Sequence, residues 1–167
     1  SYKLIFSKKE TSVNIISKLQ KKVKYEENRI QKSFKIVCDL KPDIETKKRI
    51  INFFMVEKKK QLDRSNAWNY LNIKKFSDYI ANLSDFNSEF IDFSCLKINS
   101  KIVSSHIGYK FNRQFYYIFP VYDTEFKKYS VGNILLHKLI KNYDENNYEL
   151  FDFTIGSELY KKKLNNN

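Results

Sequence analysis

Glycine is scarce in this chain of 167 residues, in which Gly108, Gly132 and Gly156 are the only three. An average usage of about 7% would give roughly a dozen. Phosphate-binding loops of the P-loop and dinucleotide-binding types need several glycines in one short turn, because the backbone must approach the phosphate closely. The scarcity therefore excludes both motifs, and it also excludes collagen-like and glycine-linker segments.

Cysteine and histidine are rarer still, with two of each. Cys38 and Cys95 are far apart in the sequence and lack the Cys/His spacing of a zinc site. Two thiols also cannot form the dense disulfide framework of a small secreted domain. We therefore expect no metal cofactor, and neither a zinc enzyme nor a serine or cysteine hydrolase.

Long apolar runs are missing as well. No stretch approaches the roughly 18 apolar residues of a membrane span, and the start of the chain lacks the pattern of a signal peptide. Together with the two isolated thiols, this predicts a cytoplasmic protein without a membrane span.

Arginine is rare although the chain is basic. Lysine and arginine total 31 against 19 acidic residues, which gives a net charge of +12. Only four of these cations are arginine, the side chain that makes bidentate contacts with phosphates and bases. The composition thus favours a lysine-coated surface over a dedicated nucleic-acid partner. A basic surface still favours anionic ligands such as phosphorylated cofactors.

Hydrophobic residues make up 42% of the chain, which is enough for one core and one domain. Apolar periodicity predicts helices over 12–24, 43–62, 72–83, 131–146 and 157–164. Runs rich in β-branched and aromatic residues predict strands over 33–38, 89–98, 101–109, 114–121 and 148–155. Short polar gaps make the middle three strands an antiparallel meander. The predicted order is β-α-α-β-β-β-α-β-α after an extra N-terminal helix, an α+β fold.

This order is that of the GNAT acyltransferase fold, a mixed, mostly antiparallel sheet flanked by helices. Three segments carry a closer resemblance: 115–123 reads FYYIFPVYD, 130–136 reads SVGNILL and 151–161 reads FDFTIGSELYK. They resemble the GNAT domain of the cellulose-biosynthesis-type acetyltransferases (Acetyltransf_6). The third segment has every fixed position of that family's terminal Phe-Asp-Phe-x-x-Gly-x-Glu-x-Tyr-Lys signature. The resemblance is strong over 96–161 and looser back to about residue 30.

The resemblance implies one GNAT-like domain over 1–167, with its core at 31–164 and a linker-helix region at 1–30. Members of the family are usually longer and contain two GNAT-like halves. We therefore expect that the chain is the C-terminal half of such a double protein. Its acceptor site would then be completed by the missing N-terminal half or by the second chain of a homodimer.

The resemblance also implies an acetyl-CoA or acyl-CoA donor. In GNAT enzymes the turn before the third helix binds the pyrophosphate through backbone N–H groups and the helix dipole. Ser130 stands where the general motif has its first glycine, and Gly132 keeps the last. The alternative is an ordinary helix start with a solvated lysine pair. The residues expected to bind the cofactor here are Lys127, Lys128, Tyr129, Ser130, Val131, Gly132 and Asn133.

The strand at 114–121 is expected to offer free backbone groups to the pantetheine arm, as in the family, in the way a peptide adds to a sheet edge. Pro120 has no N–H, so it fits a bulge or a point where strands part. Phe119 and Val121 are therefore predicted to form the mouth of the thioester tunnel. A plain edge strand protected by proline is the alternative.

Three residues are candidates for catalysis of direct attack by an amine on the thioester. Tyr160 stands where many GNAT enzymes have a tyrosine that acts as general acid, although it could equally be a core residue. Asp152 could contact the acceptor or bond to neighbouring backbone, and Asp123 could assist in deprotonating the acceptor amine. A lone strand histidine is more often structural, which favours that role for His106, and we expect His137 at the surface.

The predicted function is an acyl-CoA-dependent N-acyltransferase. Its acceptor would be an amino sugar, an amino acid or a peptidyl amine in a cell-envelope or polysaccharide pathway, by analogy with the family. One alternative is a transferase of the peptidoglycan-bridge type, which takes its acyl group from aminoacyl-tRNA. The other is a GNAT-like binding module without enzymatic activity.

Overall fold

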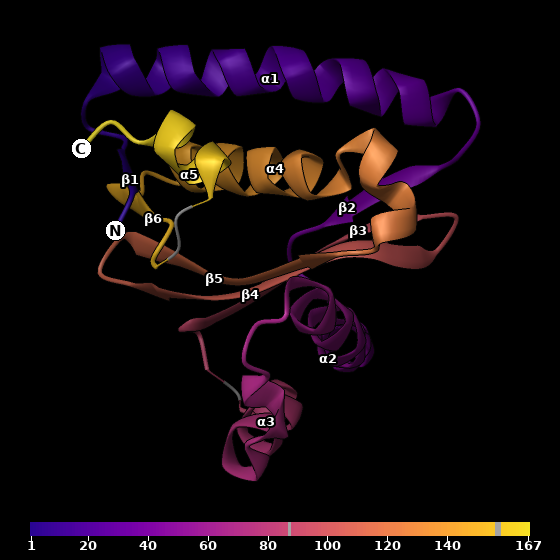
Figure 1. Cartoon of the computed structure of the whole chain (residues 1–167). Helices are drawn as coiled ribbons and strands as arrows, with labels where there is room; N and C mark the ends of the chain where they lie inside the picture. Colours follow the sequence, from indigo (N-terminus) through magenta and orange to yellow (C-terminus); the bar gives the residue numbers. More distant parts are fainter. Residues whose placement is uncertain (87, 156–157) are drawn as a thin grey trace.

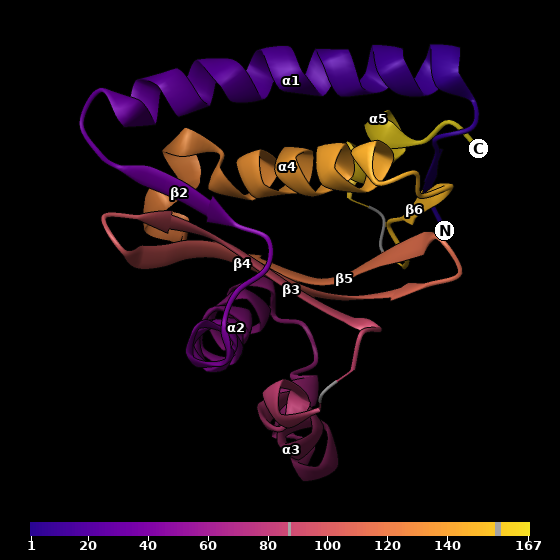
Figure 2. The same cartoon turned by 180° about the vertical axis from the view of Figure 1, so that it is seen from behind.

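The computed structural model describes residues 1–86, 88–155 and 158–167, which form a six-stranded sheet with helices on both faces (Figures 1 and 2). The strand order is β1-β6-β5-β4-β3-β2, and neighbours are antiparallel except for the parallel pair β5 and β6. The strands are β1 (Lys3–Ile5), β2 (Ile36–Asp39), β3 (Ile91–Ile98), β4 (Lys101–Phe111), β5 (Gln114–Tyr122) and β6 (Leu150–Asp152). The helices are α1 (Lys9–Gln31), α2 (Ile44–Ser65), α3 (Lys74–Ala81), α4 (Val131–Glu145) and α5 (Leu159–Leu164), with short 3₁₀ turns η1 (Tyr70–Asn72), η2 (Leu83–Asp85) and η3 (Thr124–Tyr129). The predicted α+β class and its GNAT-type order are confirmed.

The sheet separates two hydrophobic cores. Helices α4 and α5 cover one face and α2 and α3 the other, while α1 forms a further layer outside α4 (Figure 1). Phe115, Phe151 and Phe153 are fully buried in the core on the α4 side. Phe54 and Ile107 are fully buried in the core on the α2 side. Burial of such aromatic and aliphatic surface is the main favourable contribution to folding.

Helix α1 is longer than the predicted 12–24. It continues through the charged stretch before residue 31 because Ile30 is fully buried and Arg29 pairs with Glu26 at 3.2 Å. A further ion pair at 2.8 Å joins Glu27 to Lys138 of α4. The expectation that His137 lies at the surface was wrong: α1 covers that side of α4, and the histidine is only 4% exposed.

Strand β1 was not predicted. It has three residues and is held by tertiary contacts. One edge of the strand pairs with β6, and the other edge bonds to the C-terminal residues of the chain. The N–H of Lys3 donates to Asn165 Oδ1 at 2.8 Å, and that of Ile5 donates to Asn166 Oδ1 at 2.6 Å. So short a strand has too few residues to show an alternating pattern.

Strand β6 is shorter than the predicted 148–155. It ends at Asp152, shortly before Thr154, which adopts the left-handed conformation at φ 56°. Gly156 and Ser157 of the third signature segment lie outside the described residues. Helix α2 begins next to the predicted start at residue 43, where Asp43 is its N-cap and accepts from the Thr46 N–H at 2.7 Å.

A bulge interrupts the pairing of β4 with β5. Ile107 lies opposite Phe119 and Tyr109 lies opposite Tyr116, so β5 has one more residue than β4 in this stretch. The buried His106 fills the gap: its Nε2 accepts from the Ile118 N–H at 3.2 Å. A bulge bends its strand, and the pairing of β5 with β6 ends at Tyr116, where the bulge begins.

Gly108 makes room for the His106 ring. A Cβ at this position would lie 2.5 Å from the Tyr116 carbonyl oxygen and would collide with Cε1 of the imidazole. The ring itself stacks on Tyr117, with 4.4 Å between centroids and 9° between planes. The histidine therefore has the structural role that its isolated place in a strand predicts, and the glycine is required by close approach.

Gly108→Ala should lower the free energy of unfolding by about 3 kcal/mol, because backbone and a buried ring must move to admit the methyl group. Gly132→Ala is the matched control, since its Cβ would meet only a side chain, Tyr122, at 3.3 Å. Its effect should stay within about 1 kcal/mol. Urea unfolding of both variants measures the difference, and equal stabilities would contradict this account of Gly108.

Burial lowers the pKa of His106 to about 3. In the unfolded state the imidazole has an ordinary pKa near 6.5 and binds a proton at a pH where the folded state does not. The free energy of unfolding should therefore fall as the pH drops below about 6.5. Between pH 8 and pH 5 this loss is about 2 kcal/mol. Urea unfolding should show a loss smaller by about this amount in His106→Gln than in the wild type, because His137, whose pKa burial also lowers, contributes in both proteins. The same pH-dependent loss in both proteins would show that His106 is not the titrating group.

Candidate functional site

Strands β5 and β6 part after a short parallel pairing. Gln114 to Tyr116 pair with Leu150 to Asp152, and no later residue of β5 pairs with β6. The Thr154 hydroxyl donates to the Tyr117 carbonyl at 3.1 Å, and this bond links the two segments just beyond their last paired residues. Pro120 lies further along β5 and has no N–H to donate. One edge of β5 beyond the bulge is thus free of a strand partner among the described residues.

The N-terminus of α4 lies beside the end of β5. Ser130 precedes the helix in the left-handed conformation, at φ 53° and ψ 37°, which glycine adopts most readily. Its carbonyl accepts from the N–H groups of Asn133 at 2.9 Å and Ile134 at 3.1 Å. Within the described part of the chain, the N–H groups of Val131 and Gly132 have no acceptor. Two donors are therefore available at the positive end of the helix dipole.

The close approach of Gly132 to Tyr122 brings this helix start to β5. A Cβ at Gly132 would lie 3.3 Å from Cδ1 of the Tyr122 ring, so the glycine allows the two segments to touch. The free N–H groups therefore lie at the end of β5 where the two strands have separated. Ser130 and Gly132 thus occupy the predicted motif positions with the backbone shape and the closeness that those positions need.

Cations surround the turn before α4. Lys127 and Lys128 are exposed in η3, and the Lys128 Nζ lies 5.0 Å from the centre of the Tyr129 ring. Arg29 of α1 donates to the Lys128 carbonyl at 2.5 Å and lies 4.9 Å from the same ring. Sequence reasoning missed Arg29, because nothing in the local pattern of a long helix shows which turn it will reach.

Phe119 and Val121 point away from the parted edge. The Phe119 ring packs on Phe54 at 5.5 Å and on Phe76 at 6.1 Å, and Val121 is buried in the same core on the α2 side. These side chains therefore do not line the space between β5 and β6. Their backbone groups face β4, because the Asp123 N–H donates to the Val103 carbonyl and alternate residues of this stretch point the same way.

Tyr160 lies beside the start of the parted region. Its half-buried ring meets Phe153 edge-on at 6.5 Å. Burial, and to a smaller extent the charge of Glu158, raises the pKa of its hydroxyl. The pKa of Tyr117 is raised by burial and then by Tyr160 and Glu158, which therefore lie near its hydroxyl. Tyr160 is thus close to the point where β5 leaves β6.

Lys161, the last residue of the sequence signature, is buried in α5. Its Nζ donates to the Ile155 carbonyl at 2.6 Å and pairs with Glu158 at 3.0 Å. Sequence reasoning assigned it no role, although its place in the signature pointed to one. Lys161 fixes the start of α5 and with it the position of Tyr160.

Asp152 and Asp123 are both engaged with the protein. Asp152 Oδ1 accepts from the Thr154 N–H at 2.7 Å, and Oδ2 accepts from the Ser1 hydroxyl at 3.3 Å. Asp152 pairs with Tyr116, seven residues before Asp123, so the two carboxylates are roughly 20 Å apart along the strand. The structure therefore does not bring these two predicted catalytic residues together.

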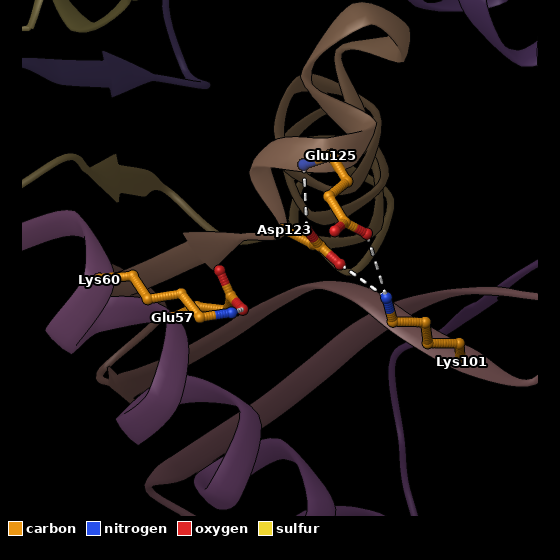
Figure 3. A network of polar contacts seen from close by, with 5 residues as sticks. All are labelled: Glu57, Lys60, Lys101, Asp123 and Glu125. Atoms are coloured by element: carbon orange, nitrogen blue, oxygen red, sulfur yellow. Dashed lines mark hydrogen bonds and ion pairs between the residues drawn. The ribbon is translucent and has the colours of Figure 1, made fainter. Parts of the chain in front are cut away.

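Asp123 belongs to the polar network of Figure 3. Its Oδ1 accepts from the Glu125 N–H at 3.0 Å, and its Oδ2 pairs with Lys101 at 2.8 Å. Burial alone would raise the pKa of Asp123, but the bonds from Lys101 and Glu125 outweigh it and lower the pKa. The buried Glu57 of α2 pairs with Lys60 at 2.7 Å nearby (Figure 3). A carboxylate with a lowered pKa is a weak base, and Asp123 anchors η3 instead.

Among the described residues, no three His, Cys, Asp or Glu side chains are grouped as metal ligands. No helix in the described part of the chain has the length and apolar character to cross a membrane.

Comparison with known proteins connects this geometry to a family. Residues 17–162 match the family model described as "Acetyltransferase (GNAT) domain", whereas no curated protein matches the sequence. One similar solved structure is the C-terminal domain of a protein described as a lysylphosphatidylglycerol synthetase from Agrobacterium fabrum, with a TM-score of 0.59, 10% identity and coverage of 90% of this chain and 44% of that one. Another is a conserved protein of unknown function from Bacteroides thetaiotaomicron, with a TM-score of 0.56, 15% identity and coverage of 98% and 53%.

These two likenesses show the fold, and the chain spans about half the length of either structure. The family match covers most of the sequence. The chain therefore belongs to the GNAT acetyltransferase domain family.

Proposed function

We propose that this protein transfers an acyl group from acyl-CoA to an amine. The family makes it an acyltransferase, and one observation supports the donor and its location. Strand β5 leaves β6 at the bulge, and the free N–H groups of Val131 and Gly132 lie where the strands have separated. A free strand edge and a helix N-terminus are complementary to an amide-bearing arm and to a phosphate group, respectively.

The chain's residues fit the donor at both places. The N–H groups of Val131 and Gly132 would bind the pyrophosphate without the need for a glycine-rich loop. Lys127, Lys128 and Arg29 add positive charge at the same turn. The backbone groups of β5 beyond Tyr117 that face away from β4, at Pro120 and Tyr122, would hydrogen-bond the pantetheine arm as an added strand does.

Tyr160 is the proton donor in this proposal. Bound acyl-CoA supplies a thioester carbonyl that an amine can attack and a thiolate that must leave. The Tyr160 hydroxyl is protonated at neutral pH and can give its proton to the thiolate as it leaves. Burial and Glu158 raise its pKa, which makes it a weaker acid, so its proposed role rests on its position and not on this shift. Lys161 joins Ile155 to Glu158 at the start of α5. Asp123 and Asp152 act as anchors of η3 and of the end of β6.

The acceptor is proposed to be an amino sugar, an amino acid or a peptidyl amine of a cell-envelope or polysaccharide pathway in the cytoplasm. This choice rests on the family resemblance. Because the chain spans about half of its structural neighbours, we further propose that a second GNAT-like half, or a second copy of the chain, completes the acceptor site.

Gly132→Val should abolish binding of acetyl-CoA. Its larger side chain must displace Tyr122, whose ring already lies 3.3 Å from the Cβ position, and this would move the two free N–H groups. Wild-type protein should bind acetyl-CoA at micromolar concentration by calorimetry and be stabilised by it in thermal melts. Gly132→Ala is the matched control and should retain most of the affinity.

Unchanged affinity in Gly132→Val would contradict the proposed pyrophosphate site. Stabilisation of the wild type by tRNA and not by acetyl-CoA would replace the donor with aminoacyl-tRNA. Stabilisation by neither would leave a GNAT-like binding module.

Tyr160→Phe should lower kcat by about a hundredfold, since general-acid catalysis contributes that order. The KM for acetyl-CoA should change by less than about threefold, because the hydroxyl acts on the leaving group and not on binding. Release of free thiol from acetyl-CoA with a panel of amines measures both. Tyr25→Phe, on the exposed face of α1, is the control. A Tyr160→Phe enzyme with wild-type kcat would remove Tyr160 from the mechanism.

A further inference from the structure

A pocket of about 380 Å³ lies at the other end of α4. Strand β2 pairs only with Cys95 to Ile98 of β3, because the chain turns away at Pro42 to begin α2. The first half of β3, from Ile91 to Ser94, therefore has no strand on that side, and the pocket opens there between β3, the β2–α2 connection and the C-terminal end of α4. Its volume lies in the range of small-molecule sites.

Asp92 is a buried acidic residue in the lining of this pocket. The residue is only 9% exposed, and its Oδ1 accepts a 2.7 Å hydrogen bond from the Tyr143 hydroxyl. Its second oxygen, Oδ2, is buried and has no hydrogen-bond partner within the described part of the chain. Burial raises the pKa of this carboxyl to about 6, against the opposing effects of Tyr143, Lys110 and Lys47. A buried carboxyl oxygen without a partner is costly, so a ligand that bonds to it gains from the pairing.

The lining is basic. Lys41, Lys47 and Lys110 line the pocket, against Glu89 and Asp92 as its acidic residues. None of the three lysines forms an ion pair with a carboxylate of the described residues. Three unpaired cations around one enclosed space favour an anion.

We propose that this pocket binds a small hydroxylated anion, with its phosphate or carboxylate group against Lys41, Lys47 and Lys110 and a hydroxyl on Asp92. A hydroxyl can donate to the ionised carboxylate and accept from the protonated acid, so it suits both states of Asp92. A second carboxylate or phosphate at Asp92 would meet a like charge when that group is ionised. Sugar phosphates and sugar acids are ligands of this class.

The pocket is separate from the proposed donor site. Val131 and Tyr143 lie 12 residues apart on α4, which corresponds to about 18 Å along the helix. The donor site uses the N-terminal end of this helix and the pocket uses the C-terminal end. The inference therefore does not rest on the proposed function, and acetyl-CoA binding should be unaffected by substitutions in the pocket.

Calorimetry with four probes tests the ligand class. Glucose 6-phosphate or gluconate should bind with a Kd of about 1 mM or tighter, whichever anion the lysines prefer. Glucose, which lacks the anion, and inorganic phosphate, which lacks the hydroxyls, should each bind at least about tenfold more weakly than the better of the two. If neither glucose 6-phosphate nor gluconate binds at about 10 mM, the proposal is overturned.

Substitutions locate the binding. Lys110→Ala and Lys47→Ala should each weaken it about tenfold or more, and the exposed Lys75→Ala on α3 should not. Asp92→Asn keeps an oxygen for the Tyr143 hydroxyl and should weaken glucose 6-phosphate more than inorganic phosphate. Binding that is unchanged in all three pocket variants would overturn the proposal.

Amide chemical shifts of the wild-type protein decide the location even where a variant fails to fold. Addition of glucose 6-phosphate or gluconate should shift the signals of Phe93 and Asn142, which line the pocket. Shifts confined to the start of α4 around Gly132 would assign the binding to the donor site and overturn the inference.

Discussion

The hydrogen bond from the Ile118 N–H to His106 Nε2 is the interaction on which the separation of β5 from β6 depends. In a regular antiparallel ladder that N–H would face a backbone carbonyl, but a buried imidazole takes its place and leaves β5 with one residue more than β4. The bend that follows coincides with the last pair between β5 and β6, at Tyr116. Gly108 has no side chain because the imidazole needs its space. The buried His106 and the space left by Gly108 thus determine where β5 becomes free of β6.

Helix α4 reaches from the proposed donor site at its N-terminus to the pocket at its C-terminus, and it is buried on more than one side. Its residues Ile134, Leu135 and Leu136 are consecutive and all buried, which a helix on a sheet surface with one solvated face would not allow. The cover is α1, which packs along α4 (Figure 1). It also carries Arg29 to the turn before α4. The N-terminal helix is therefore an integral layer of the domain, and its removal would expose the apolar outer side of α4.

Most of the elements, in their order, and the start of α4 could be predicted from the sequence, whereas the short strand β1 and the partners of individual polar groups could not. Apolar periodicity and the spacing around Ser130 and Gly132 are local properties, and both appear in the structure as expected. The partner of a carboxylate is a tertiary property. The sequence around Asp123 suggests a possible base, but its carboxylate pairs with Lys101, which lies 22 residues earlier in the chain. The lack of an N–H at Pro120 pointed to a bulge or a strand separation there, whereas the bulge lies between Tyr116 and Phe119, because its place depends on how β4 lies against β5.

The net charge of +12 has a local meaning that composition alone could not show. A lysine on a solvated helix face contributes little to stability or binding, because water and salt screen it. Lys47 and Lys110 differ from such residues: they are partly buried, unpaired among the described residues, and close enough to oppose the raised pKa of Asp92. Partial burial weakens screening, so their field acts on whatever enters the pocket. Burial raises the pKa of Asp92 and the two lysines oppose that rise, and a ligand hydroxyl can bond to either form of the carboxyl group.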